Sequence, residues 1–199
     1  ASAPTQGQYP GLDERTSARI EERERIGLRA AELVQDGETV MIDSGSTTIQ
    51  LARALAFRGT QCTVITNSIP VAMTIGHGAP EVLLCPGEYL AAESAVIGTE
   101  TLEFLRRFNV DRCMIGASGL SCEGPSETVR GFAAVKRMML SRASKRHLLI
   151  DSHKFGRKGL AHVGAMADLN SIVVDARPKG ELLASLDGAD VEIVVARSN

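Results

Sequence analysis

Short apolar runs alternate with amphipathic segments along most of this chain, and the connections between them are short. Residues 40–42, 62–66 and 81–85 are rich in β-branched and other apolar side chains, which is typical of buried strands. The intervening segments 47–58 and 70–75 have helical character, and each ends before a glycine. Because strands joined through helices pair in parallel, the pattern predicts an α/β fold: a Rossmann-like parallel sheet flanked by helices.

The second half of the chain continues this alternation less regularly. It predicts a helix at 99–108, a strand at 111–118, a polar loop at 121–126 suited to act as a lid, and a helix at 132–144. Residues 89–97 fit neither a helix nor a strand clearly. A short helix at 179–186 and four short strands, some forming a smaller additional strand set, complete the prediction: 147–150, 160–167, 171–175 and 191–196.

The composition is that of a globular protein, with 44% apolar and 23% charged residues in a chain of 199. We place one domain at 13–199, beginning with a helix at 13–35, and interpret residues 1–12 as a linker or a remnant of cloning. The charged run 21–25 in that helix predicts a solvated face. A formal net charge of −2 does not favour nucleic-acid binding over the whole surface. The sequence has no apolar run long enough to cross a bilayer and no signal peptide, so we expect no membrane partner.

The segment 43–48, Asp-Ser-Gly-Ser-Thr-Thr, connects the first predicted strand to its helix. Gly45 is able to take a positive φ and to let the backbone approach a ligand. The hydroxyls of Ser46, Thr47 and Thr48 lie where the first helical N–H groups lack partners. A strand, a loop of small residues and a helix N-terminus together predict an anion-binding site, with an ordinary helix cap as the alternative.

Two further polar segments follow predicted strands. Residues 66–68 come after the second strand, where Asn67-Ser68 is expected to cap the next helix, and residues 86–88 come after the third. In parallel sheets, ligands bind beyond the carboxyl ends of the strands. The convergence of segments 43–48, 66–68 and 86–88 at that edge therefore predicts a binding crevice.

No metal or organic cofactor is predicted. The chain has neither a Walker motif nor Gly-x-Gly-x-x-Gly, so a nucleotide does not follow from its glycines. Its histidines lack H-x-x-x-H spacing, which leaves surface or satisfied core positions as the expectation. The cysteines form no C-x-x-C pair, and buried free thiols of a cytosolic protein are favoured over a disulfide or zinc: Cys62, Cys85, Cys113 and Cys122.

Short motifs follow one another in a set order: Asp43-Ser-Gly-Ser-Thr-Thr48, Thr66-Asn-Ser68, Gly116-Ala-Ser-Gly119, Ala134-Val-Lys-Arg137 and Asp151-Ser-His-Lys-Phe-Gly156. With these motifs, the chain from about Arg15 to Ala196 resembles the C-terminal effector domain of DeoR/GlpR-type transcriptional repressors. The resemblance implies a fold like that of ribose-5-phosphate isomerase and the CoA-transferase group. It also implies a cytoplasmic protein whose ligand is a phosphorylated sugar, a polyol phosphate or a related metabolite.

Members of this family carry an N-terminal helix-turn-helix domain that binds operator DNA. This sequence shows no such pattern, so the resemblance implies an effector domain alone, with DNA as a partner only through the missing domain. Repressors of palindromic or repeated sites need matched half-site spacing, and the effector domain is the natural place for that symmetry. We therefore expect a homo-oligomer.

The resemblance and the anion loop together predict the ligand-binding residues. Backbone N–H groups of the 43–48 loop hold the phosphate, and Lys154 is the preferred cation, with Lys136 as the alternative. Side chains at the strand ends bind sugar hydroxyls, although Asp43 and Asp151 are equally suited to cap the next turn. The expected set is Asp43, Ser44, Gly45, Ser46, Thr47, Thr48, Thr66, Asn67, Ser68, Gly87, Glu88, Ser118, Gly119, Lys136, Asp151 and Lys154.

Three departures from the family pattern bear on activity. Ser118 stands where the family often has Asp, Gly131-Phe132 where it often has Glu-Glu, and Pro86-Gly87 where it often has Gly-Gly. The first two remove carboxylates from the region where related isomerases keep their acid and base, so we expect no catalytic residue. Phe132 indicates a less polar ligand end, or packing alone.

Two other functions stay open at this point. A sugar-phosphate isomerase on the same fold needs a positioned general base, for which Glu88 and Glu127 are the nearest residues. The other alternative is an oligomerisation module whose crevice binds nothing. Ligand-induced stabilisation separates a sensor from such a module, and turnover identifies an enzyme.

Overall fold

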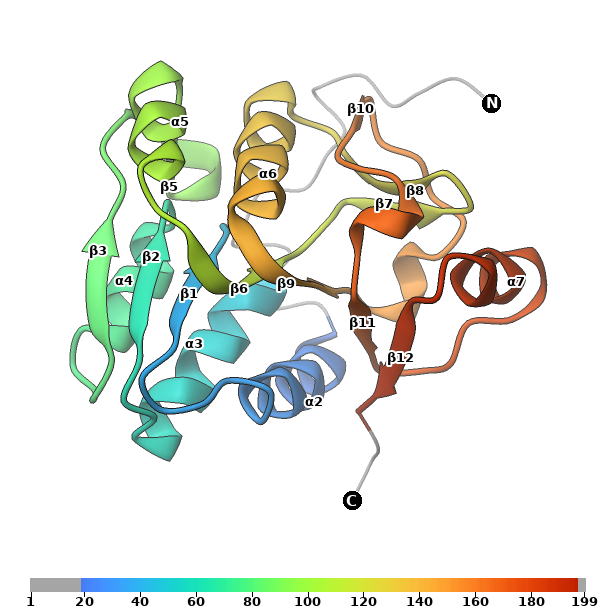
Figure 1. Ribbon diagram of the computed structural model, residues 1–199, viewed down its shortest axis with the longest axis horizontal. Coiled ribbons are helices and arrows are strands. Elements are labelled where there is room, and N and C mark those ends of the chain that lie inside the picture. Colours follow the sequence, from blue (N-terminus) through green and yellow to red (C-terminus); the bar gives the residue numbers. More distant parts are fainter. Residues whose placement is uncertain (1–18, 197–199) are drawn as a thin grey trace.

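The computed structural model describes residues 19–196 (Figure 1). The linker expected at 1–12 and the start of the helix expected at 13–35 lie outside the described residues. The remainder is a three-layered α/β unit, which confirms the predicted fold class.

The central sheet has seven parallel strands in the order β12-β11-β9-β6-β1-β2-β3. The chain therefore starts in the middle of the sheet and builds outward in both directions. The strand bounds are β1 Thr39–Ile42, β2 Thr63–Thr66, β3 Glu81–Leu84, β6 Val110–Ile115, β9 Ala143–Leu149, β11 Ser171–Val174 and β12 Glu192–Val195.

Helices cover both faces of this sheet. In Figure 1, α2 and α3 lie below the sheet, whereas α5 and α6 lie above it; side chains of α4 join the hydrophobic cluster of α2 and α3. Side chains of α7 join the same hydrophobic cluster as those of α5 and α6. The helix bounds are α2 Ile20–Ala31, α3 Ser46–Arg58, α4 Ile69–Ile75, α5 Thr99–Arg106, α6 Arg130–Arg142 and α7 Gly180–Gly188.

The two-residue period of the strands divides the core into two clusters. Met41 packs with residues of α5 and α6, whereas its neighbours Val40 and Ile42 pack with residues of α2, α3 and α4. In the same way, Cys113 and Met114 of β6 belong to opposite clusters. A parallel sheet buried on both faces requires apolar side chains at successive positions, which is why its strands appear as continuous apolar runs in the sequence.

Two small antiparallel sheets accompany the main sheet. The segment at 89–97 forms a hairpin of β4 (Glu88–Leu90) and β5 (Ala95–Ile97) around a 3-10 turn. The second small sheet has the order β10-β8-β7, in which β8 pairs with both of its neighbours. Its strands are β7 Gly119–Ser121, β8 Gly124–Glu127 and β10 Ala161–His162.

The prediction of a polar lid at 121–126 is wrong. This segment is the β7–β8 turn and most of β8, and Pro125 and Ser126 are buried. Gly124 has φ +114°, and a Cβ there would lie 2.1 Å from the Gly164 carbonyl oxygen. The hairpin therefore packs closely against the chain near Gly164, a contact that local polarity does not reveal.

Several element boundaries also differ from the prediction. Helix α2 ends at Ala31, and the strand expected at 160–167 is only β10 followed by a 3-10 turn at Met166–Asp168. Strand β9 begins at Ala143, directly after α6 and four residues earlier than expected. The cause is long-range, because β9 pairs with β6 from Val110↔Ala143 onward despite its polar first residues.

Within residues 19–196, no helix is both long enough and apolar enough to cross a membrane. Cys62, Cys85 and Cys113 are buried free thiols, as predicted, while Cys122 is exposed. Burial raises the pKa of Cys85 and of Cys113 to about 12, so these thiols are protonated at neutral pH.

Candidate ligand-binding site

The edge at which the sequence predicts a binding crevice lies where the sheet reverses its order. Strand β1 continues through α3 to β2 on one side, while its other neighbour β6 leads through α6 to β9 on the opposite side. The chain therefore leaves β1 toward one face of the sheet and reaches α6 on the other face after β6. The carboxyl ends of these two adjacent strands are left uncovered between the two connections. This is the topological switch point at which α/β sheets bind ligands.

The 43–48 loop enters α3 at this point. The N-cap of α3 is Gly45, which makes no side-chain capping hydrogen bond within the described part of the chain, and Ser46 and Thr47 are buried. Gly45 has φ 167°, an extended conformation open to any residue, so the expectation of a positive φ is wrong. The Thr48 hydroxyl donates to the carbonyl oxygens of Asp43 (2.9 Å) and Gly45 (3.0 Å), and so fixes the loop.

Asp43 and Lys136 form the centre of the site. One Asp43 carboxylate oxygen accepts a hydrogen bond from the Gly116 N–H at 3.1 Å, and the other pairs with the Lys136 ammonium. Lys136 also lies 3.3 Å from the Glu127 carboxylate, and it is 2% exposed. Two carboxylates therefore neutralise Lys136, which argues against the alternative that it is a free cation held ready for phosphate.

Glu127, which the sequence indicates only as a possible general base of the enzyme alternative, also belongs to this cluster. Its second carboxylate oxygen accepts a hydrogen bond of 2.6 Å from the Ser118 hydroxyl. The Glu127 carboxylate, which belongs to β8, thus lies beside Ser118, the position where the family often has Asp. The Gly-Pro-Ser residues before Glu127 have the composition of a loop, whereas the structure places them in β8.

Lys154 lies at the same edge of the sheet. It ends the 3-10 turn Ser152–Lys154 after β9, and its ammonium donates to the Ala117 carbonyl oxygen at 2.8 Å. The side chain is partly exposed. Lys154 therefore reaches from the end of β9 to the end of β6, as its assignment to the site requires.

The loop after β2 borders the crevice, because Ile42 pairs with Thr66 in the sheet. Ser68 accepts a hydrogen bond from the Val71 N–H at 3.3 Å, which confirms its predicted capping role. The Asn67 amide nitrogen donates to the Val96 carbonyl oxygen at 3.0 Å. Its buried Oδ1 has no hydrogen-bond partner among the described residues, so this acceptor is left for a further donor.

The structure does not bring Gly87 and Glu88 to the Asp43 cluster by any hydrogen bond or ion pair among residues 19–196. A Cβ at Gly87 would lie 2.2 Å from the Thr101 hydroxyl oxygen, so a packing requirement explains this glycine. Glu88 is exposed and pairs with Ile97. Gly119 also has a packing role, since a Cβ there would lie 2.3 Å from the Arg157 carbonyl oxygen.

Asp151, at the end of β9, is paired with a residue that the sequence did not indicate. The Arg23 guanidinium Nε lies 3.5 Å from Asp151 Oδ2, and the two side chains are 6% and 1% exposed. The prediction of a solvated face at 21–25 is therefore wrong for Arg23. Its spacing held the signal, because Arg23 precedes the buried residues Ile26, Gly27 and Ala30 by three, four and seven positions.

The charges in the crevice balance one another. Asp43 and Glu127 share Lys136, Asp151 pairs with Arg23, and Lys154 lies alongside on the Ala117 carbonyl. Attraction for an anion must then come largely from the uncapped N–H groups of α3 and the helix dipole. Within the described range, no group of His, Cys, Asp and Glu side chains is arranged to hold a metal ion.

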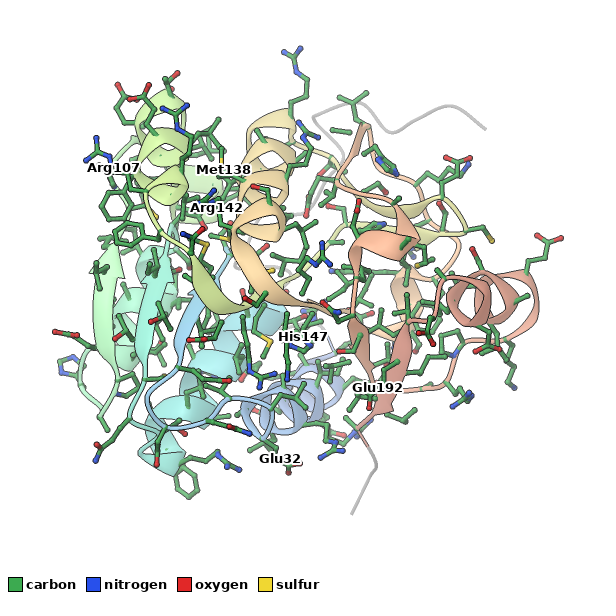
Figure 2. The ribbon with its side chains drawn as sticks, viewed as in Figure 1. Glu32, Arg107, Met138, Arg142, His147 and Glu192 are labelled. Atoms are coloured by element: carbon green, nitrogen blue, oxygen red, sulfur yellow. The ribbon has the colours of Figure 1, made fainter. Side chains whose placement is uncertain are left out.

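A second polar cluster occupies the opposite, amino-terminal edge of the sheet. His147 Nδ1 lies 2.8 Å from the Ser171 hydroxyl, and its Nε2 lies 3.3 Å from the Arg112 guanidinium. Glu32, His147 and Glu192, labelled in Figure 2, line one cavity of about 470 Å³ there. His147 is thus a satisfied core histidine, in line with the expectation for the scattered histidines.

The sequence comparisons identify the family. Residues 18–176 match the family model described as the DeoR C terminal sensor domain. The chain belongs to this family. It is 27% identical to the glycerol-3-phosphate regulon repressor of Escherichia coli over 97% of this chain and 77% of the relative. It is 31% identical to the HTH-type transcriptional repressor GlcR of Bacillus subtilis over 90% of this chain and 69% of the relative.

Other relatives and solved structures agree with this assignment. The lactose phosphotransferase system repressor of Streptococcus mutans is 28% identical over 85% of this chain and 68% of the relative. Ribose 5-phosphate isomerase A of Methanocaldococcus jannaschii shares the fold with a TM-score of 0.53 at 17% identity, over 69% of this chain and 55% of that one. The eIF2B delta structure from Chaetomium thermophilum gives 0.54 at 17% identity, over 73% of this chain and 52% of that one. At these identities the likeness establishes the fold alone.

Proposed function

We propose that this DeoR-type sensor domain binds a phosphorylated sugar or polyol, with the phosphate at the N-terminus of α3. The names of two relatives, the glycerol-3-phosphate regulon repressor and the lactose phosphotransferase system repressor, support this chemical class. In the full-length protein, the ligand modulates operator binding by a helix-turn-helix domain outside this chain.

The observation that carries the proposal is the start of α3 at the switch point between β1 and β6, where the N-cap residue Gly45 has no side chain to cap it. This helix has 13 residues, and among residues 19–196 its N-cap residue, Gly45, makes no side-chain hydrogen bond to its first N–H groups. Ser46 and Thr47 add buried hydroxyls at the same point. A phosphate carries about −1.5 to −2 charges at neutral pH and has several acceptor oxygens, which match these donors.

The test is a thermal-shift panel of glycerol 3-phosphate, glucose 6-phosphate and galactose 6-phosphate, each beside its unphosphorylated form. A ligand at 100 times its Kd stabilises the fold by about 2.7 kcal/mol. Only phosphorylated compounds are expected to raise the melting temperature. A shift caused by an unphosphorylated compound alone would contradict the phosphate assignment.

A substitution at the first position of α3 tests the location. Ser46→Pro removes the N–H and the hydroxyl at a position where helices tolerate proline. We expect calorimetry to show affinity for the phosphorylated ligand lowered about ten- to a hundredfold, the loss of one charge-assisted hydrogen bond. Ser46→Ala is the control that keeps the N–H, and it should lose less. Equal affinities of the two variants and the parent protein would show that the phosphate does not bind at the N-terminus of this helix.

The enzyme alternative has little support in the site. Glu127, the carboxylate nearest Ser118, is held by Lys136, and Glu88 is exposed on the β4–β5 hairpin. The relatives are named as transcriptional repressors. We therefore expect no aldose–ketose interconversion; turnover that Glu127→Gln abolishes would favour the isomerase reading.

The assembly is part of the same proposal. We expect the isolated chain to form a homo-oligomer by light scattering and to leave operator DNA unshifted in a mobility assay. A monomer, or sequence-specific DNA binding by this chain, would contradict the proposed division of roles.

A further inference from the structure

Helix α2 contacts the carboxyl edge of the sheet and α3 through two close contacts. In its first turn, Arg23 forms the buried ion pair with Asp151 at 3.5 Å. One turn later, its backbone meets α3 at Gly27, where a Cβ would lie 2.5 Å from the backbone carbon of Gln50. The helix is therefore fixed both to the loop after β9 and to the helix that starts at the anion loop.

The Asp151 carboxylate is short of hydrogen bonds. Both of its oxygens are buried, and neither has a hydrogen-bond partner among residues 19–196. Asp151 occupies the N-cap position of the turn Ser152–Lys154, yet its side chain does not cap that turn. Asp175 binds the first residue of the turn, accepting hydrogen bonds from the Ser152 N–H at 2.6 Å and from the Ser152 hydroxyl at 2.8 Å. The capping role expected as an alternative for Asp151 is thus excluded.

Buried carboxylates normally accept several hydrogen bonds, so Asp151 has unused acceptor capacity. The position of Asp151 in the sheet suggests which hydrogen-bond donors its carboxylate accepts from. Strand β9 is separated from β1 by β6 alone, and adjacent strands lie about 4.8 Å apart, which puts the end of β9 about 10 Å from the end of β1. A phosphorylated chain of several carbons spans much of that distance, whereas inorganic phosphate does not.

We propose that Asp151 binds the hydroxyl end of the phosphorylated ligand, and that Arg23 makes α2 the element that responds to occupancy. This inference rests on the proposed function and deepens it. Ligand hydroxyls donate to the Asp151 oxygens while Arg23 keeps its ion pair, so the bound state holds α2 more firmly against the sheet. Linkage is reciprocal: the factor by which the ligand shifts the equilibrium between held and released α2 equals the factor by which holding α2 raises the affinity for the ligand.

Hydrogen exchange on the whole chain tests the response of α2. The probes are glycerol 3-phosphate and glucose 6-phosphate, with inorganic phosphate as the matched probe that lacks hydroxyl-bearing carbons. We expect at least one of the two organic probes to slow exchange of the α2 amides about tenfold, while inorganic phosphate protects only the start of α3. Helix α7 provides the internal reference. Equal protection of α2 by inorganic phosphate would overturn the inference.

Asp151→Asn tests the residue without changing its shape. We expect it to lower affinity for the organic phosphate about ten- to a hundredfold and to abolish protection of α2, while affinity for inorganic phosphate stays unchanged. The control is Glu22→Gln, in the same turn of α2, whose partner is the neighbouring Arg19 at 3.6 Å; it should change neither quantity.

The outcomes separate the two proposals. If organic phosphates bind in a Ser46→Pro-sensitive way but Asp151→Asn alters neither affinity nor α2 exchange, this inference is wrong and the proposed function stands. If no phosphorylated probe binds the folded protein, both are wrong.

Discussion

At the scale of single residues, the site is built from buried charges that hold one another. Lys136 bridges Asp43 and Glu127, and all three side chains are at most 11% exposed. Such a cluster stabilises the fold only when all of its charges are present, because each buried charge has lost its hydration and only the attraction of an opposite charge offsets that loss. This arrangement fixes the ends of β1 and β8 relative to α6.

Lys136→Met is therefore expected to destabilise the domain by about 3–5 kcal/mol, since it leaves two buried carboxylates without their cation. The control is Lys158→Met, which removes a pair with Glu123 whose side chains are 59% and 69% exposed. That change should leave the free energy of unfolding nearly unchanged, because solvent screens the exposed pair. Urea unfolding followed by circular dichroism measures both; similar losses would show that Lys136 does not carry this stabilisation.

At the scale of elements, the packing of α2 on α3 depends on the absence of one side chain. Gly27 is buried in the interior of α2, and a Cβ there would also lie 2.7 Å from the Leu51 nitrogen. The backbones of the two helices therefore approach more closely than any larger residue allows. This contact couples the helix carrying Arg23 to the helix that begins at the anion loop.

Gly27→Ala should destabilise the fold by about 1–3 kcal/mol, because overpacking outweighs the gain of about 1 kcal/mol in helix propensity. Gly188→Ala is the matched control at the end of α7, where an added Cβ meets nothing within 4 Å. It should be neutral or stabilising. Thermal unfolding of the two variants gives the comparison, and a stabilised Gly27→Ala protein would contradict the close approach.

At the scale of the whole molecule, the sheet carries a polar cluster at each end. The carboxyl end holds the crevice, and the amino end holds His147 with Arg112 and Ser171. Since the guanidinium donates to Nε2, the Nδ1–H donates to Ser171, and the ring is neutral. Burial, together with the charges of Arg112 and Lys145, lowers the pKa of His147 to about 4.

Global stability should therefore depend on pH through His147. Its pKa lies below the ordinary 6.5, so the unfolded chain binds the proton first as the pH falls. Neutral His147 makes its full contribution to the free energy of unfolding above about pH 6.5, and this contribution is lost as the pH falls toward 4. The loss between pH 7 and pH 5 is about 2 kcal/mol. His147→Gln should flatten this dependence in urea unfolding, whereas the exposed control His77→Gln should not. Identical pH profiles of all three proteins would contradict the assignment.

The sequence by itself determined most of the main sheet and its helices. The strands at 40–42, 62–66 and 81–85 and the helix after the 43–48 loop lie within a few residues of their predicted bounds. Ser68 caps α4 as expected. These features depend on side-chain periodicity and on hydrogen bonds between near neighbours, and both can be read over a short window.

Tertiary structure alone decided the pairing of charges and the small sheets. Arg23 lies in a run that has the pattern of a solvated face, and it is buried because Asp151 arrives beside it from the end of β9. Strand β8 has the composition of a loop, yet it is a strand because β7 and β10 supply its hydrogen bonds. Lys136 is paired with Asp43 and Glu127, which reach it from distant parts of the chain. Local propensity differs by about 1 kcal/mol between residue types, whereas an unpaired buried charge costs several, so long-range partners decide wherever the two disagree.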